Sequence, residues 1–168
     1  GLARKSVEYN HLSPYIVIHE ADWNHLSPLF SAGSFDRVVV NPPYFSPGAG
    51  KQSLTPAARL ARHEQPGTLQ GLADSAARLL RNGGVFCLCH RPERLADVVV
   101  ALRSARLEPK RLRPVQQRAS DAPWLMLWEA RKNGRPGLSV LSPLVLKNPD
   151  GTPSQDYQSL FRVPDRQF

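Results

Sequence analysis

The stretch Phe35-Asp36-Arg37-Val38-Val39-Val40-Asn41-Pro42-Pro43-Tyr44 decides the fold of this sequence. Its first six residues, 35–40, end in a continuous apolar run, 38–40, which is typical of a strand buried on both faces of a parallel sheet. The strand stops at Asn41, because the prolines that follow have no N–H to donate to a central ladder. In open α/β sheets, ligands bind beyond the carboxyl ends of the strands, so the residues that follow position 40 are candidates for a functional site.

Apolar runs alternate with helical patterns on both sides of this strand. We expect helices over 2–11, 57–64, 68–80 and 92–105, and strands over 15–19, 35–40, 85–89, 109–117 and 124–130. Strands separated by helices of roughly a dozen residues indicate an α/β fold with a mostly parallel sheet and right-handed crossovers. Only a turn, around 118–123, separates the last two strands, and this predicts an antiparallel hairpin at one sheet edge.

The composition fits one domain with a real core, and it sets limits on the partner. A net charge of +8 indicates a polyanionic partner, although an arginine-rich, high-GC genome explains the excess equally well. No apolar run reaches the ~18 residues of a membrane span. Cys87 and Cys89, two apart in one expected strand, do not suit an ordinary disulfide and fit a reducing, cytoplasmic setting. Their Cys-x-Cys-His context lacks a second pair of ligands, so we expect no metal.

The residues that follow the strand carry hydrogen-bond acceptors and an aromatic ring. The side-chain carbonyl of Asn41 and the backbone carbonyl of Pro42 can accept both hydrogens of an exocyclic adenine amine. That amine is a poor nucleophile, because its lone pair is delocalised into the ring. Two fixed acceptors draw the nitrogen toward tetrahedral geometry and aim its lone pair at a methyl donor. Tyr44 offers a flat face for a flipped-out base. The alternative interpretation is a strand followed by a proline turn with a surface aromatic residue.

The strand and its Asn41-Pro42-Pro43-Tyr44 end together resemble motif IV of the class I S-adenosylmethionine-dependent amino-methyltransferases, which act on adenine N6, cytosine N4 or protein glutamine. Other segments resemble the bacterial tRNA1(Val) adenine-37 N6-methyltransferase family. These segments are Phe45, Ala58-Arg59-Leu60-Ala61-Arg62-His63-Glu64, Gly137-Leu138, Ser142-Pro143-Leu144-Val145 and Asp150-Gly151. The resemblance covers nearly the whole chain. It implies a Rossmann-like class I fold, S-adenosyl-L-methionine as cofactor and tRNA as substrate, with the chain acting as a monomer.

The resemblance also assigns roles to individual residues. Catalytic roles fall on Asn41, Pro42 and Tyr44, and cofactor contacts on Asp22, Trp23 and Asn41. Substrate contacts fall on Pro43, Tyr44, Phe45, Arg59 and Arg62, and the basic segment described below adds Arg111 and Arg113. For Asp22 the alternative is a plain helix N-cap, and for Arg59 and Arg62 it is a solvated basic face. Basic residues also crowd 103–118, against the single acid Glu108, which suggests a contact with the RNA backbone. We expect His90, Trp124 and Trp128 to be core residues.

One element of the class is missing from the sequence. Class I methyltransferases hold the cofactor with a glycine-rich loop after their first strand, and only Gly1 and Gly33 precede Asn41. We therefore expect a fragment, with a partial methyltransferase domain over 1–131 and a loop-rich tail over 132–168. Alone, it should bind the cofactor weakly and be inactive. Two alternatives stay open: another amino-methyltransferase, acting on rRNA, DNA or protein glutamine, and a non-catalytic RNA-binding remnant.

Overall fold

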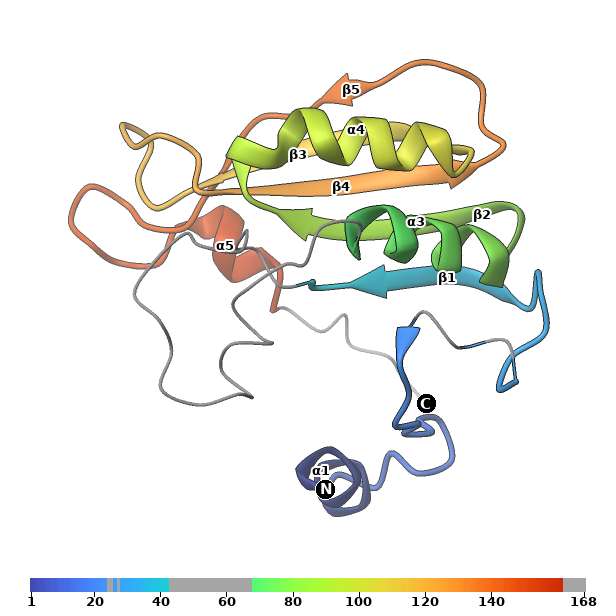
Figure 1. The fold of residues 1–168 in the computed structure, drawn as a ribbon. Coiled ribbons are helices and arrows are strands. Elements are labelled where there is room, and N and C mark those ends of the chain that lie inside the picture. The colour runs from blue at the N-terminus through green and yellow to red at the C-terminus, as the bar shows by residue number, and fades with distance from the viewer. Residues whose placement is uncertain (24–25, 27, 43–67, 162–168) are drawn as a thin grey trace, which may run out of the picture.

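The computed structural model describes residues 1–23, 26, 28–42 and 68–161 (Figure 1). Its elements, in chain order, are α1 (Leu2–Tyr9), β1 (Phe35–Val40), α3 (Thr68–Leu79), β2 (Leu80–His90), the 3-10 helix η2 (Pro92–Arg94), α4 (Leu95–Ser104), β3 (Leu107–Gln116), β4 (Leu125–Lys132), β5 (Ser139–Val140), β6 (Leu144–Val145) and α5 (Gln155–Ser159). Among these described residues, no helix is long and apolar enough to cross a membrane.

The strands form one mixed sheet in the order β1-β2-β4-β3-β5, and β6 also pairs with β3. β1 and β2 are parallel, as are the short pairings of β5 and β6 with β3. β4 is antiparallel to both of its neighbours, because the chain turns back after β3 and places β4 between β2 and β3. The α/β class and the C-terminal hairpin predicted from the sequence are confirmed.

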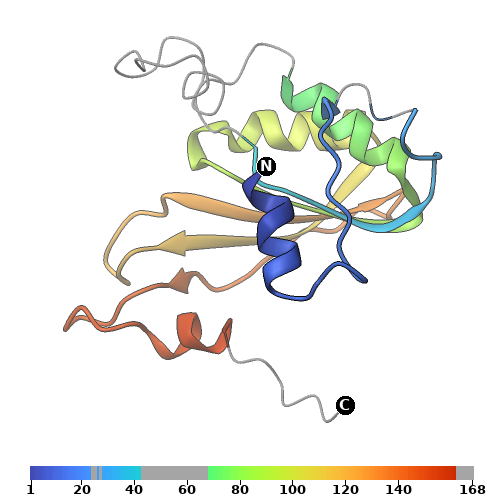
Figure 2. The same cartoon turned by 90° about the horizontal axis from the view of Figure 1, so that it is seen from below.

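The helices α3 and α4 cover one face of the sheet, whereas α5 lies on the other side (Figure 2). The alternating burial along β2 follows from this arrangement, because successive strand side chains point to opposite faces. The core lies between the helices and the sheet. Its members include Leu72, Ala76, Phe86, Leu88, Val98, Leu102, Leu112, Trp128 and Ala130. Each large apolar side chain buried there stabilises the fold by about 1.5–3 kcal/mol.

The second face of β1 is open in the described part of the chain, contrary to the sequence prediction of burial on both faces. Val38 and Val40 pack against the core, but Val39 between them is 72% exposed. No described helix packs on that face of β1, so its side chain meets solvent. β1 is also the last strand at its end of the described sheet.

The predicted strand at 15–19 is wrong. Residues 16–20 have no regular secondary structure, and Tyr15 and Val17 are 84% and 75% exposed. β-branched residues favour a strand only where a neighbouring strand and a buried face receive them, and no described strand lies beside this segment. The helix predicted over 2–11 exists as α1, although none of its residues is buried.

Two further boundaries differ from the predictions. The strand expected over 85–89 begins earlier, because α3 ends at Leu79 and β2 follows at once from Leu80, so Gly83 and Gly84 lie within the strand. Gly83 has a φ of 74°, a left-handed conformation that suits glycine. The chain after Lys132, expected to be loop-rich, contributes β5, β6 and α5. The expected helix at 57–64 lies outside the described residues.

Candidate active site

Asn41 is the first residue after β1, at the carboxyl end of the strand. The β1–β2 register pairs Val40 with Leu88, so the next residues, Asn41 and Cys89, are also neighbours. The Cys89 Sγ–H donates a hydrogen bond to Asn41 Oδ1 at 3.2 Å. The Asn41 side chain is exposed and Pro42 is buried. The amide is therefore anchored from the neighbouring strand while it remains open to a ligand.

Several residues with predicted roles follow Asn41 and Pro42 directly. Pro43, Tyr44 and Phe45, together with Arg59 and Arg62, lie in the segment 43–67, outside the described residues. The stacking role of Tyr44 and the substrate contacts assigned to the other four residues stay predictions.

An open cavity of about 650 Å³ lies beside Asn41 on the sheet face opposite α3 and α4. Cys87 and Cys89 both line it, because alternate residues of one strand point to the same face. The other lining residues are Val39, Val40, Asn41, Leu88, Arg111, Arg113, Leu127, Trp128, Glu129 and Leu141. Most of the wall is apolar, and the polar groups are concentrated on β3 and β4.

The polar groups of the cavity form a row across three strands. Cys87 of β2 is paired in register with Glu129 of β4, and Glu129 with Arg111 of β3. Arg111 Nη2 donates to the Glu129 carboxylate, and this ion pair raises the pKa of Arg111. Burial raises the pKa of the Cys87 thiol, and the Glu129 charge raises it further, although Arg37 and Arg111 act in the opposite direction. Cys87 is therefore a protonated thiol near neutral pH and a poor nucleophile.

Arg111 and Arg113, predicted to contact RNA, line the cavity near Asn41 but already have acidic partners. Arg111 pairs with Glu129, and Arg113 pairs with Asp156 of α5. Arg113 Nε also donates to the Ser142 carbonyl at 3.2 Å. Their charges are compensated within the protein, so their contact with RNA stays a prediction.

Asp22 and Trp23 were predicted to contact the cofactor from a strand end. The preceding segment forms no strand, so the strand end that would present them is absent from the described structure. Asp22 is exposed, and the half-buried Trp23 packs against the core. Their role at the cofactor stays a prediction.

Sequence reasoning missed two features of the site. The Cys89–Asn41 contact depends on strand register, which no local pattern reveals. Trp124, expected in the core, is 41% exposed because it precedes β4 in the turn of the hairpin. The other two expected core residues are buried, His90 at 0% and Trp128 at 3% exposure.

The strand order, with β4 antiparallel between β2 and β3, fits a Rossmann-like fold, which solved methyltransferase structures share. A predicted O-methyltransferase from Agrobacterium tumefaciens superposes with a TM-score of 0.73 at 21% identity, over 94% of this chain and 69% of that one. TrmN from Thermus thermophilus superposes with a TM-score of 0.50 at 22% identity, over 79% of this chain and 32% of that one. At these identities the likeness establishes the fold.

Among curated proteins, the chain is similar to the tRNA1(Val) (adenine(37)-N6)-methyltransferase of Proteus mirabilis (strain HI4320). The two are 25% identical over 133 residues, which cover 74% of this chain and 50% of the relative. This chain therefore spans half the length of that curated relative. No protein-family model matches the chain.

Proposed function

We propose that this protein is an S-adenosylmethionine-dependent N-methyltransferase that acts on adenine N6 in RNA, with tRNA as its substrate. The observation that carries the proposal is the exposed amide of Asn41 at the carboxyl end of β1, anchored by Cys89 and followed by Pro42-Pro43-Tyr44. The name of the curated relative, a tRNA adenine-N6 methyltransferase, supports the choice of RNA and of the position on the base.

Asn41 and Pro42 are the residues to which we assign the target amine. Asn41 Oδ1 has two lone pairs, and the Cys89 thiol occupies one, which leaves the other for an amine hydrogen. The Pro42 carbonyl accepts the second hydrogen, in a direction restricted by the proline ring. With both hydrogens held, the lone pair of the nitrogen points away from the protein carbonyls and toward the methyl group. The nitrogen then loses one proton to solvent, so no general base is required.

S-adenosylmethionine, when bound, supplies an electrophilic methyl group on a sulfonium centre. We assign Asp22, Trp23 and Asn41 to it. The exposed carboxylate of Asp22 suits the amine of the cofactor adenine, and the ring of Trp23 suits its flat face. These assignments cover the adenine end and the methyl end of the cofactor, and they leave the ribose and the methionine without assigned partners.

Nucleic acid is the substrate class that suits the remaining assignments. We propose that Tyr44 stacks on the flipped base, with Pro43 and Phe45 shaping the pocket and Arg59, Arg62, Arg111 and Arg113 facing the backbone. The net charge of +8 favours RNA over a glutamine side chain of a protein.

A methyl-transfer assay tests the proposal directly. Labelled S-adenosylmethionine is incubated with tRNA and the protein at its full natural length, and the digested nucleosides are analysed for N6-methyladenosine. We expect Asn41→Ala to lower kcat by about a hundredfold or more, because the variant lacks one of the two fixed acceptors at the reacting group, while tRNA binding stays near that of the parent. The matched control is Asn82→Ala, an exposed asparagine at the far end of β2.

The outcomes separate the competing functions. An Asn41→Ala variant that retains activity within about tenfold contradicts the role of the amide. If the label appears in rRNA, DNA or a glutamine peptide and not in tRNA, the substrate is one of those molecules and not tRNA. RNA binding without transfer to any of these acceptors supports a binding module in place of an enzyme.

A further inference from the structure

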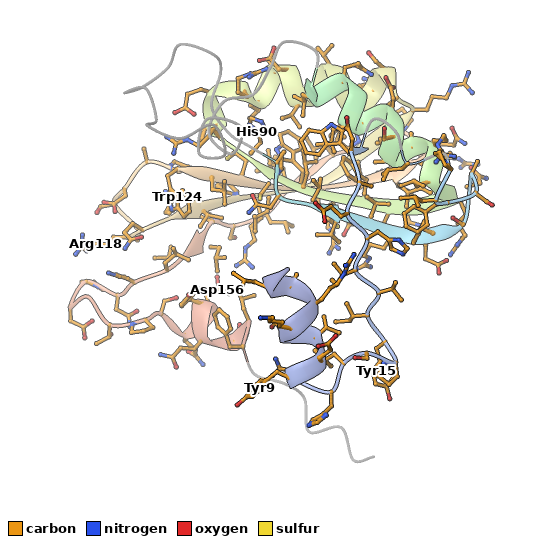
Figure 3. The ribbon with its side chains drawn as sticks, turned by 60° about the horizontal axis from the view of Figure 1, so that its bottom comes forward. Tyr9, Tyr15, His90, Arg118, Trp124 and Asp156 are labelled. Carbon is orange, nitrogen blue, oxygen red and sulfur yellow. The ribbon has the colours of Figure 1, made fainter. Side chains whose placement is uncertain are left out.

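The β3–β4 hairpin turn presents an exposed aromatic ring and a cation at the same sheet edge as Asn41. β4 is antiparallel to both β2 and β3, so the end of β3 lies at the carboxyl edge of β1 and β2. Arg118 follows β3 and Trp124 precedes β4, and Figure 3 labels both at this end of the hairpin. Lys147 joins them from the chain after β6, where its N–H donates to the Gln117 carbonyl at 2.9 Å.

We propose that Arg118, Trp124 and Lys147, here called the hairpin platform, bind single-stranded RNA that leads into the Asn41 site. The direction in which the bound RNA leads rests on the proposed function, but the contacts of the hairpin platform with RNA do not depend on methyl transfer. The register places Leu127 of β4 level with Cys89, and hence with Asn41. Trp124 lies three residues before Leu127 and two strands away from β1, about 10 Å along the sheet and about 10 Å across it.

The side chains of the platform are available to a ligand, in contrast to the two cations that line the cavity. Trp124 is 41% exposed, and Arg118 and Lys147 are exposed. Within the described chain, neither the Arg118 guanidinium nor the Lys147 ammonium has a hydrogen bond or ion pair. Arg111 and Arg113, by comparison, are both paired with carboxylates. Among the described residues at this edge, Arg118 and Lys147 are therefore cations whose side chains have no carboxylate partner.

The backbone of the platform is held in place before any ligand arrives. The Arg118 N–H donates to Asp121 Oδ2 at 3.0 Å, and the Asp121 N–H donates back to the Arg118 carbonyl at 3.0 Å. Gln116 Nε2 donates to the Asp121 carbonyl at 2.7 Å, and the Trp124 N–H donates to the Val115 carbonyl at 3.0 Å. The Asp121 carboxylate, the acid of this turn, is thus occupied by the turn itself. A preorganised turn reduces the ordering entropy that binding must overcome.

The chemistry of the platform favours unpaired RNA over other polyanions. An exposed indole ring stacks on any base, but only a base that has left its duplex offers a free face. Two cations at the same end of the sheet suit the phosphates of such a segment. A target adenine that must be flipped into a site near Asn41 lies in an unpaired segment of the same kind.

Fluorescence anisotropy with the full chain tests the platform. The probe is a short labelled single-stranded RNA of mixed sequence, titrated without cofactor at several salt concentrations, beside a duplex of the same sequence. We expect Trp124→Ala to weaken binding about tenfold and Trp124→Phe to restore most of it, because phenylalanine keeps a stacking face. Combined Arg118→Ala and Lys147→Ala should reduce the slope of log affinity against log salt by about 1.4, which is about 0.7 for each phosphate that the variant no longer neutralises. The matched control is Arg135→Ala, an exposed arginine of the turn at the opposite end of β4, which should bind like the parent.

Several results overturn the inference. These are parental binding by Trp124→Ala, equal affinity for the duplex, an unchanged salt slope, or tighter binding to vesicles of anionic lipid than to RNA. If platform variants bind like the parent while methyl transfer to tRNA proceeds, the inference fails and the proposed function stands. If RNA binding depends on Trp124 while no acceptor is methylated, the proposed function fails and the platform stands.

Discussion

Cys89 on β2 donates a hydrogen bond from its Sγ to Oδ1 of Asn41, the residue that follows β1, over 3.2 Å. The contact joins the two parallel strands at the edge where a ligand would bind. It also fixes which way the Asn41 carboxamide is turned, because the thiol marks the oxygen as the acceptor. Cys89 is therefore a positioning residue for Asn41.

Removing the thiol should lower the rate of methyl transfer more than it changes substrate binding. A hydrogen bond of this kind contributes about 1 kcal/mol, so we expect Cys89→Ala to lower kcat about fivefold with KM for tRNA near that of the parent. Cys89→Ser keeps a donor at the same position and should recover most of the rate. Steady-state kinetics of the two variants measure this. Equal rates for alanine and serine, or a change confined to KM, would show that the thiol does not orient the amide.

The two faces of the sheet should respond very differently to truncation. Phe86 is 1% exposed in the core, so Phe86→Ala should lower the free energy of unfolding by about 3–5 kcal/mol. Val39 on the neighbouring strand is 72% exposed on the open face, so Val39→Ala should change it by no more than about 0.5 kcal/mol. Urea titrations followed by circular dichroism compare the two variants. A large destabilisation by Val39→Ala would mean that this face is covered in solution.

Local patterns were enough to predict the α/β class and most strands, for reasons that particular residues make clear. The valines before Asn41 predicted β1, and the turn after β3 predicted the hairpin. The same patterns failed at Tyr15 to His19, because a β-branched run forms a strand only when a neighbour pairs with it, and sequence does not say whether that neighbour exists.

The candidate site was predictable at Asn41 and not around it. Its position after a strand, followed by Pro42, is a local signal. The partners of Asn41, Arg111 and Arg113 come from other strands or from α5, and their pairing depends on register over long sequence separations. The sequence prediction put Trp124 in the core, because a large apolar residue next to an apolar run looks like part of the strand. The strand begins one residue later, at Leu125, so Trp124 lies in the turn.

The last prediction concerns the reactivity of Cys87. Burial raises the pKa of its thiol, and the Glu129 charge adds to the effect. A raised pKa means a smaller thiolate fraction at any given pH, so alkylation of Cys87 by iodoacetamide should be slower than that of a free cysteine and should accelerate only at more alkaline pH.

Glu129→Gln removes the negative charge and leaves Arg111 without its acidic partner. Both changes lower the pKa of Cys87, so the alkylation curve should move to lower pH. Mass spectrometry of a Cys89→Ser background isolates the signal of Cys87, with Glu93→Gln as the control because Glu93 lies beyond the end of β2. An identical curve in Glu129→Gln and its parent would mean that Glu129 does not act on the thiol.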